Sequence, residues 1–434
     1  MMSIELTIIL ILLIAVLVLL ASEKISYFGV SVLVLTTLTV SGILEPKETL
    51  ANIADPTIML YVGSFIISAA FGKVRLAQMI GKRGETLLVK ISHNEELVLF
   101  CISIAIAILT IFLQAMAIQV AMMTIILSLA DQLGISKKKA LLALGFSATI
   151  GSTFTLLGNN VNLLAKAAYE ETVAGGTWAF MELSLLTVPM GLVMMALFCF
   201  GTSKLIRDDP KADSVWDQRV QDGSATKTED ETTAPGAHKL IVLAVTAFFS
   251  FSLVLDGKFF IPANVAVLLC ATVLVMTNVM TTEEIMQSIS WPIILFTVSV
   301  LALSSAFSKV GAGDYLAELV VRLLGDTISL RTMVVTIFIV ATLATQVLSN
   351  SGTFAVILPI VVPLAVRLGI PVKPVIVTLC LASSCAYLTP LSAPTFPILA
   401  AAGKISFKEF FIQGLPLTVI SIILSAVFIP ILWG

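Results

Sequence analysis

Neutral polar side chains interrupt otherwise apolar stretches at four places in this sequence. Two lie in the second half: residues 345–353 combine Thr, Gln, Ser, Asn and Gly, and residues 389–397 carry three prolines. The other two lie in the first half, at residues 152–162 with three asparagines and, more weakly, at Gln114. Hydroxyl, amide and main-chain oxygens can hold Na⁺, and broken helices direct their free N–H and C=O groups at a central site. The chemistry that these residues favour is therefore ion binding without charged side chains.

The same segments also fit structural roles that involve no ligand. The second-half segments could be a Ser/Thr-rich helix contact and an ordinary proline kink. Residues 158–162 could be a surface loop between two crossings. Asparagine is unfavourable inside helices and costly in lipid, so this run favours a cavity lining or a helix end. The occurrence of both second-half breaks after one hairpin favours the functional reading.

Composition places these breaks in a membrane protein. Of 434 residues, 58% are apolar and 12% are charged, against about 45–50% and about 25% in soluble domains. The net charge of -2 provides no basic field for a nucleic acid. The cysteines lie in apolar runs without a C-x-x-C pair, and the two histidines lie in polar stretches, which argues against a zinc site or a haem-binding subunit. Residues 4–21 are too long for a cleaved signal and lack its positively charged n-region, so they predict a retained transmembrane helix.

The helices that position the breaks can be predicted from the lengths of the apolar runs. A hydrocarbon layer of about 30 Å needs roughly 20 apolar residues per helix. Apolar runs lie near residues 4–22, 26–43, 57–74, 96–113, 117–130, 140–157, 184–201, 240–256, 261–278, 291–308, 331–348, 352–366, 372–391 and 415–433. These runs predict an all-α polytopic membrane protein.

The chain repeats itself at an offset of 236 residues. Glu48 then stands opposite Glu284, Pro56 opposite Pro292, and Lys73-Val74 opposite Lys309-Val310. A polar, turn-rich stretch separates the two copies. An internal repeat in a membrane protein indicates two halves around a shared midplane site.

The copies are inverted if each contains one re-entrant hairpin. Residues 96–130 and 331–366 are the expected hairpins, which leaves five crossings per half, and an odd number turns the second half over. We therefore expect a first inverted repeat over 1–201, a linker over 202–239 and a second repeat over 240–434. The expected broken helices span about 140–170 and about 372–400. Non-helical backbone at such depth must be surrounded by protein or water.

Positive charges orient this arrangement. One side of the membrane collects 17 Lys and Arg residues and the other collects 8. The positive-inside rule then predicts a cytoplasmic 202–239 linker, with both termini outside, in what we expect to be a bacterial inner membrane.

The membrane core is expected to carry no charge, since every charged residue is predicted at a helix end, in a loop or in an amphipathic segment. A proton exchanger generally needs an intramembrane carboxylate or histidine, so its absence argues against proton exchange. No nucleophile, base and orienting group converge, so we do not expect an enzyme.

At these breaks the chain resembles the divalent anion/sodium symporter family, within the larger ion transporter superfamily, over nearly its whole length. Members carry a Ser-Asn-Thr motif at each hairpin tip, and here the second tip reads Ser349-Asn350-Ser351 with Thr345 before it. The broken helix that follows reads Ser392-Ala393-Pro394-Thr395. The first half departs, with Gln114-Ala115-Met116 at the tip and Gly158-Asn159-Asn160-Val161-Asn162 in the broken helix.

The resemblance implies an elevator-type transporter, a homodimer in the lipid bilayer, and a small anionic substrate such as a dicarboxylate, citrate or sulfate. Na⁺ in the second half would bind Thr345, Ser349, Asn350 and Ser392. A first-half Na⁺ site would use Gly158 and Asn162. The substrate would contact Asn350, Ser351, Pro394, Gln114, Asn159 and Asn160.

These roles predict sodium-coupled uptake of a small anion, with no organic cofactor and no nucleic-acid partner. Two alternatives stay open. One is a sodium-independent exchanger or uniporter of the same fold, and the other is a non-transporting membrane subunit. Substrate identity and the number of Na⁺ ions are not predicted.

Overall fold

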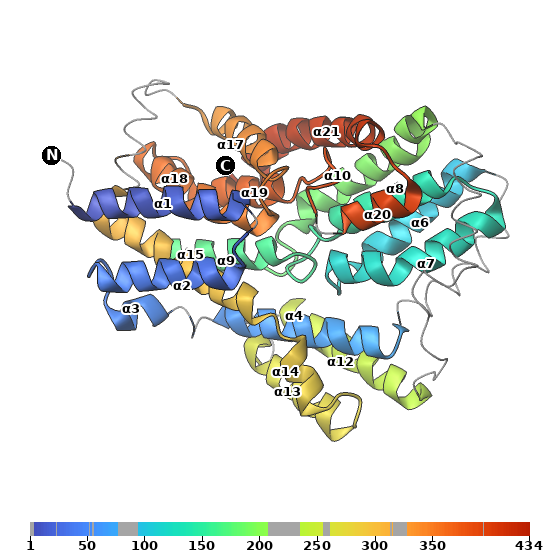
Figure 1. Ribbon diagram of the computed structural model, residues 1–434, viewed down its shortest axis with the longest axis horizontal. Helices are drawn as coiled ribbons and strands as arrows, with labels where there is room; N and C mark the ends of the chain where they lie inside the picture. Colours follow the sequence, from blue (N-terminus) through green and yellow to red (C-terminus); the bar gives the residue numbers. More distant parts are fainter. Residues whose placement is uncertain are drawn as a thin grey trace.

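A computed structural model describes residues 4–22, 24–51, 53, 56–76, 94–206, 235–254, 261–312, 315, 328–393 and 395–434. Every regular element in these residues is a helix, which confirms the expected all-α class (Figure 1). Most of the expected linker and the substrate candidate Pro394 lie outside the described residues.

Most of the helices follow the predicted apolar runs. The first half contains α1 (Ile4–Ser22), α2 (Tyr27–Val40), α3 (Pro46–Ala51), α4 (Pro56–Lys73), α6 (Glu95–Leu109), α7 (Ala115–Leu133), α8 (Lys137–Gly151), α9 (Asn160–Thr172), α10 (Ser184–Ala196), a π-helical turn (Leu197–Gly201) and a 3-10 turn (Thr202–Leu205). The second contains α12 (Gly236–Val254), α13 (Ala263–Met276), α14 (Thr282–Ser288), α15 (Trp291–Val310), α17 (Leu330–Ala344), α18 (Asn350–Arg367), α19 (Val372–Ser383), α20 (Phe396–Gly403) and α21 (Phe407–Trp433). Helices α3, α9, α14 and α20 have no predicted run of their own.

The two halves pack on each other reciprocally. Helix α2 packs against α15, and its counterpart α13 packs against α4. Lys73 Nζ lies 2.6 Å from Glu284 Oε2, and Lys309 Nζ lies 2.8 Å from Glu48 Oε2. Each ion pair joins one half to the other. The two pairs are equivalent, because the repeat matches Lys73 to Lys309 and Glu48 to Glu284. The repeat is therefore also a repeat of contacts in space.

Two helix pairs turn back at the centre of the molecule. Helices α6 and α7 are joined by residues 110–114, and α17 and α18 by residues 345–349. In Figure 1 the first pair lies toward the right end and the second toward the left end. Helix α8 packs against both α6 and α7, as α19 packs against both α17 and α18. Residues 96–130 and 331–366 each therefore contain a turn between two helices.

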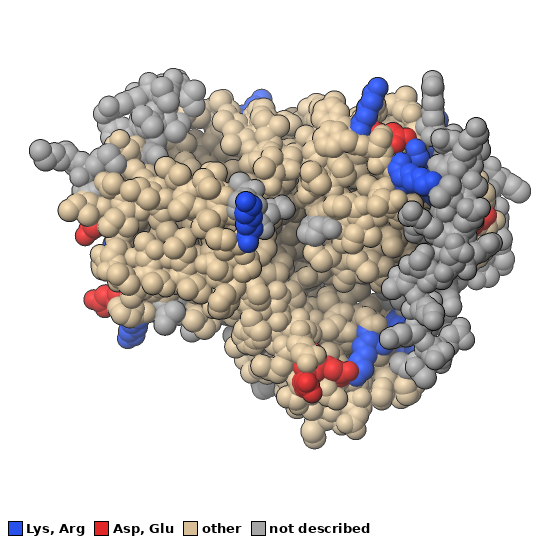
Figure 2. All heavy atoms as spheres, in the orientation of Figure 1, with Lys and Arg blue, Asp and Glu red and all other residues tan. Residues whose placement is uncertain are grey.

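Charge is scarce on the described surface. Figure 2 shows a face whose middle is almost entirely uncharged, with most charged side chains near its edges. Within the described residues, five helices are long and apolar enough to cross a membrane: Ala115–Leu133, Ser184–Leu205, Trp291–Val310, Asn350–Arg367 and Phe407–Trp433. Seven further apolar helices are shorter.

One cation among the described residues is buried. Lys166 lies inside α9, which is an amphipathic helix, and is only 7% exposed. Its ammonium group pairs with Glu170, four residues later on the same helix. A buried ammonium group needs such a partner because desolvation is otherwise costly.

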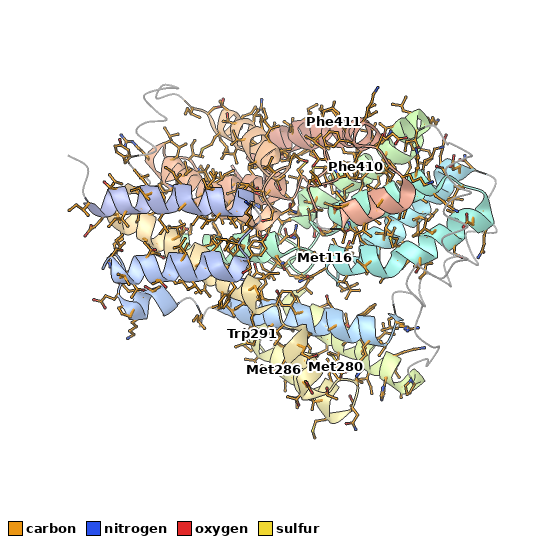
Figure 3. All side chains as sticks on the ribbon, viewed as in Figure 1. Met116, Met280, Met286, Trp291, Phe410 and Phe411 are labelled. Carbon is orange, nitrogen blue, oxygen red and sulfur yellow. The ribbon has the colours of Figure 1, made fainter. Side chains whose placement is uncertain are left out.

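Helix α21 packs directly on the break after α19. Phe410 is buried and contacts Phe146 edge-on with ring centroids 5.2 Å apart, while the adjacent Phe411 is exposed (Figure 3). One turn further along α21, a Cβ added at Gly414 would lie 1.7 Å from Tyr387 O, in the unwound segment. Only a glycine allows this approach of helix to backbone.

Replacing Gly414 with alanine should therefore prevent α21 from packing against the main chain of Tyr387 and Leu388. We expect a loss of about 3 kcal/mol or more, since a clash with main-chain atoms cannot be relieved by a rotamer change. Thermal unfolding of the purified protein measures this loss. Gly72→Ala is the matched control: nothing lies within 4 Å of an added Cβ there. A Gly414→Ala protein as stable as Gly72→Ala would contradict the packing.

Candidate functional site

The four breaks meet at one cavity of about 120 Å³ between the halves. Its lining consists of Gln114, Ala115, Met116, Gln119, Thr149, Ser152, Gly158, Asn159, Asn160, Asn350, Ala393 and Thr395. Met116, which is 49% exposed, marks the cavity on the first turn of α7, near the middle of the molecule (Figure 3). None of these described lining residues is charged.

Four helices begin at the cavity. Its lining includes the first residues of α7, α9 and α18, together with Thr395, the N-cap of α20. The N-caps of α7 and α20, Gln114 and Thr395, make no side-chain capping bond. A helix N-terminus carries about half a positive charge, so four of them offset roughly two negative charges. The cavity is therefore suited to an anion although it contains no cation.

Amides connect the breaks across the cavity. Gln114 Nε2 donates to Asn160 Oδ1 at 3.2 Å, which joins the first hairpin tip to α9. Asn159 caps α9 by accepting from Val161 N, and its Nδ2 donates to Ser384 Oγ at 3.0 Å. The second contact joins the two halves. Asn159 thus holds both a helix end and the opposite broken segment.

Oxygen atoms gather at the second hairpin tip. Thr345 Oγ1 lies 2.9 Å from Asn350 Oδ1 and 2.7 Å from Ser383 O, and Thr345 is fully buried. One hydroxyl proton serves two acceptor oxygens here. The hydroxyls of Ser383 and Thr353 are buried and have no hydrogen-bond partner. Such unpartnered oxygens are costly unless a positive group approaches them, which fits a Na⁺ ion at this tip.

The hydroxyl and side-chain amide oxygens in the first-half break have hydrogen-bond partners. The hydroxyls of Ser152, Thr153 and Thr155 each donate to a main-chain carbonyl at 2.7 Å. Asn162 is fully buried, and its Nδ2 donates to Ser152 O at 2.9 Å and to Thr155 O at 2.6 Å. This segment is closed by the protein's own donors.

The structure brings most of the substrate candidates together. Gln114, Asn159, Asn160 and Asn350 all line the cavity. Ser351 does not: it lies in the first turn of α18, half-buried.

The residues predicted to bind Na⁺ do not all lie together. Thr345 and Asn350 are in contact, while the Ser349 side chain caps α18 by accepting from Gly352 N at 3.1 Å. Ser392 Oγ donates to Ala386 O and Thr389 O, within its own loop. In the first half, Gly158 lines the cavity, whereas Asn162 does not.

One polar group at the cavity, one turn into α7, was not among the residues predicted from the sequence. Gln119 is 2% exposed, and its Nε2 donates to Gly145 O at 3.0 Å. Thr395 donates to Gln119 Oε1, so α20 of one half is joined to α7 of the other. Thr149 also lines this part of the cavity. A lone glutamine in an apolar run was the available signal.

Comparison with known proteins gives a family match over nearly the whole chain. The sequence profile of the citrate transporter family, CitMHS, matches residues 17–350 and 327–434. The sodium-dependent dicarboxylate transporter SdcS of Staphylococcus saprophyticus is 24% identical over 432 residues, covering 93% of this chain and 81% of that protein. An uncharacterised transporter of Haemophilus influenzae is 23% identical over 406 residues, covering 90% and 84%.

Solved structures share the fold. The YdaH transporter of Alcanivorax borkumensis superposes with a TM-score of 0.63 at 11% identity and covers 99% of this chain and 98% of its own. MtrF of Neisseria gonorrhoeae, described as illuminating a class of antimetabolite efflux pumps, gives 0.60 at 14% identity, with 99% and 95% covered. Both likenesses concern the fold alone.

Proposed function

The chain belongs to the citrate transporter family, and from that premise we propose that it couples inward Na⁺ movement to the uptake of a small anion, such as a dicarboxylate, citrate or sulfate. It is an integral membrane transporter and not an enzyme. Its match to SdcS agrees with the resemblance to the divalent anion/sodium symporters. The finer assignment rests on the uncharged cavity at four helix N-termini.

Anion binding follows from the cavity's polarity. Helix N-termini supply partial positive charge, and the amide groups of Gln114, Asn159 and Asn160 supply donors without adding a fixed charge. A permanent cation would hold an anion strongly in every state of the cycle. Partial charges on separate elements hold it only while those elements converge, so release is possible when they move apart.

The oxygens at the second hairpin tip support the proposal of Na⁺ coupling. Thr345, Asn350 and Ser383 would hold the ion, and Asn350 also lines the anion cavity. A cation at this tip adds positive potential next to the anion and fixes Asn350 in place. Each ligand therefore stabilises the binding of the other, which is the thermodynamic content of coupling.

The proposed transport movement separates the helices into two sets, one that moves and one that stays fixed. We propose inverted repeats at 1–201 and 240–434 around a cytoplasmic 202–239 linker, with re-entrant hairpins in α6–α7 and α17–α18. The hairpins and broken helices would move as an elevator against α1–α4 and α12–α15 in a homodimer. The exchanged ion pairs Lys73–Glu284 and Lys309–Glu48 support a framework built from both halves.

Proteoliposome uptake tests the function. Purified protein is reconstituted and offered radiolabelled citrate, succinate and sulfate, each with an inward Na⁺ gradient or with K⁺ at equal ionic strength. We expect saturable uptake of one of these anions in Na⁺ and at least a tenfold lower rate in K⁺. Equal uptake in both cations, together with counterflow, would instead indicate the sodium-independent exchanger or uniporter.

A further inference from the structure

The two halves provide very different surroundings for a cation. Aligning α6 with α17 and α7 with α18 at their first residues places Thr110 opposite Thr345 and Ala115 opposite Asn350. This offset is 235, one residue less than the sequence repeat, which places Gln114 opposite Asn350. The Thr110 hydroxyl donates to Ala107 O at 2.8 Å, within its own helix end. Ala115 has no side-chain oxygen. The Thr345 hydroxyl therefore has no free counterpart in the first half, and the nearby Gln114 amide is joined to Asn160 Oδ1 through its Nε2.

The unwound main chain of the first half is also occupied. Its carbonyls at Ser152 and Thr155 both point at Asn162 Nδ2, at 2.9 and 2.6 Å. An amide nitrogen has two N–H donors, and both are used here. A cation coordinating the same two carbonyls would need the space that this nitrogen fills. Turning the amide around would set its oxygen against both carbonyls, which is repulsive.

Neighbouring contacts hold that amide in place. Cys380 Sγ, on α19 of the second half, lies 3.3 Å from Asn162 Oδ1 and donates to it. The hydroxyls around the break donate elsewhere: Thr155 to Ile111 O and Ser152 to Thr149 O. In contrast to Ser383 and Thr353, the described side chains of residues 94–162 include no buried polar atom without a partner.

We propose that the Asn162 amide permanently takes the place of a coupling cation in the first half, so that this half is held closed without Na⁺. The sequence-based expectation of a first-half Na⁺ site at Gly158 and Asn162 does not fit the residues present. This inference rests on the proposed function, because it concerns how many cations that function uses. A neutral amide avoids the desolvation cost of a second buried cation. It also means that Na⁺ acts only at the second-half tip.

Thermal stability in Na⁺ and in K⁺, at equal ionic strength, tests this with the full-length protein and three variants: Thr345→Val, Asn162→Asp and the double variant. Wild type should gain about 2 °C or more in Na⁺, with a single-site concentration dependence. Thr345→Val should lose that gain over the same range. The double variant should regain it, since a carboxylate at position 162 provides both oxygen and charge for a cation. Asn94→Asp, an isosteric change at an exposed helix N-cap, controls for the added charge.

Each result decides the inference. A Thr345→Val protein that keeps the wild-type Na⁺ response binds the cation at a site other than the second-half tip, and the inference is wrong. If either variant fails to fold, the wild-type Hill coefficient for Na⁺ in uptake decides: a value near one supports the inference, and a value near two overturns it. If Na⁺ does not change the thermal stability of the wild type, the proposal of Na⁺ coupling is wrong instead. In that case Asn162→Asp alone decides the role of Asn162, by gaining a Na⁺ response or by showing none.

Discussion

Changing Asn159 to aspartate should reduce anion uptake by about 100-fold or more while the protein remains folded. The substitution preserves shape and preserves the oxygen that caps α9 by accepting from Val161 N. It removes the donor to Ser384 and places a negative charge in a cavity that holds none. At an effective dielectric constant near 20, two charges about 5 Å apart repel by about 3 kcal/mol, which corresponds to more than 100-fold in affinity.

The measurement is kcat/KM for the transported anion at pH 8, where the new carboxylate is ionised. Asn94→Asp is the control, because Asn94 caps α6 through the same kind of bond, to Glu96 N at 3.0 Å, and is exposed outside the cavity. It should transport at the wild-type rate. Uptake by Asn159→Asp within threefold of this control would show that the anion does not bind beside α9.

Valine in place of Thr345 should raise the Na⁺ concentration for half-maximal uptake by about 30-fold. Valine has nearly the volume of threonine but no oxygen, so the change removes one ligand and leaves the packing of a fully buried position intact. Loss of one buried polar interaction of about 2 kcal/mol corresponds to this factor. The maximal rate at saturating Na⁺ should change much less, because Thr345 does not line the anion cavity.

Sodium titration of uptake at fixed anion concentration measures this effect. Thr353→Val gives the comparison within the same tip: its hydroxyl is buried and unpartnered, so the same loss there would add Thr353 to the ligand set. Ser308→Ala, at an exposed position on α15, should leave the titration unchanged. A Thr345→Val titration that superposes on wild type would place the Na⁺ site elsewhere.

The elements themselves were readable from local composition. Apolar length predicted the helices because burial in lipid or in a membrane-protein core depends on the residues of each segment alone. The turns at residues 110–114 and 345–349 begin inside the predicted runs 96–113 and 331–348 and end at the start of the gaps that follow them. The short helices α9 and α20 were not among the apolar runs: α9 carries Lys166, Glu170 and Glu171, and α20 spans only eight residues.

The candidate site was readable only in part. Gln114, Asn159, Asn160 and Asn350 stood out because amides are rare in apolar runs, and all four line the cavity. Gln119 gave the same kind of signal but stood alone in its run, and only the fold shows that it reaches Thr395 of the other half.

By itself the sequence determined that this is a polytopic helical membrane protein with a repeated half, broken helices and neutral polar groups at the breaks. Which of those groups are free for a ligand was decided by tertiary structure. Asn162 and Thr345 were both predicted as ion ligands. Asn162 Nδ2 donates to the carbonyls of Ser152 and Thr155, whereas Thr345 Oγ1 lies beside oxygens of Asn350 and Ser383. The reason is that a residue type fixes how many hydrogen bonds a side chain can make, whereas their partners come from segments that meet only when the chain folds.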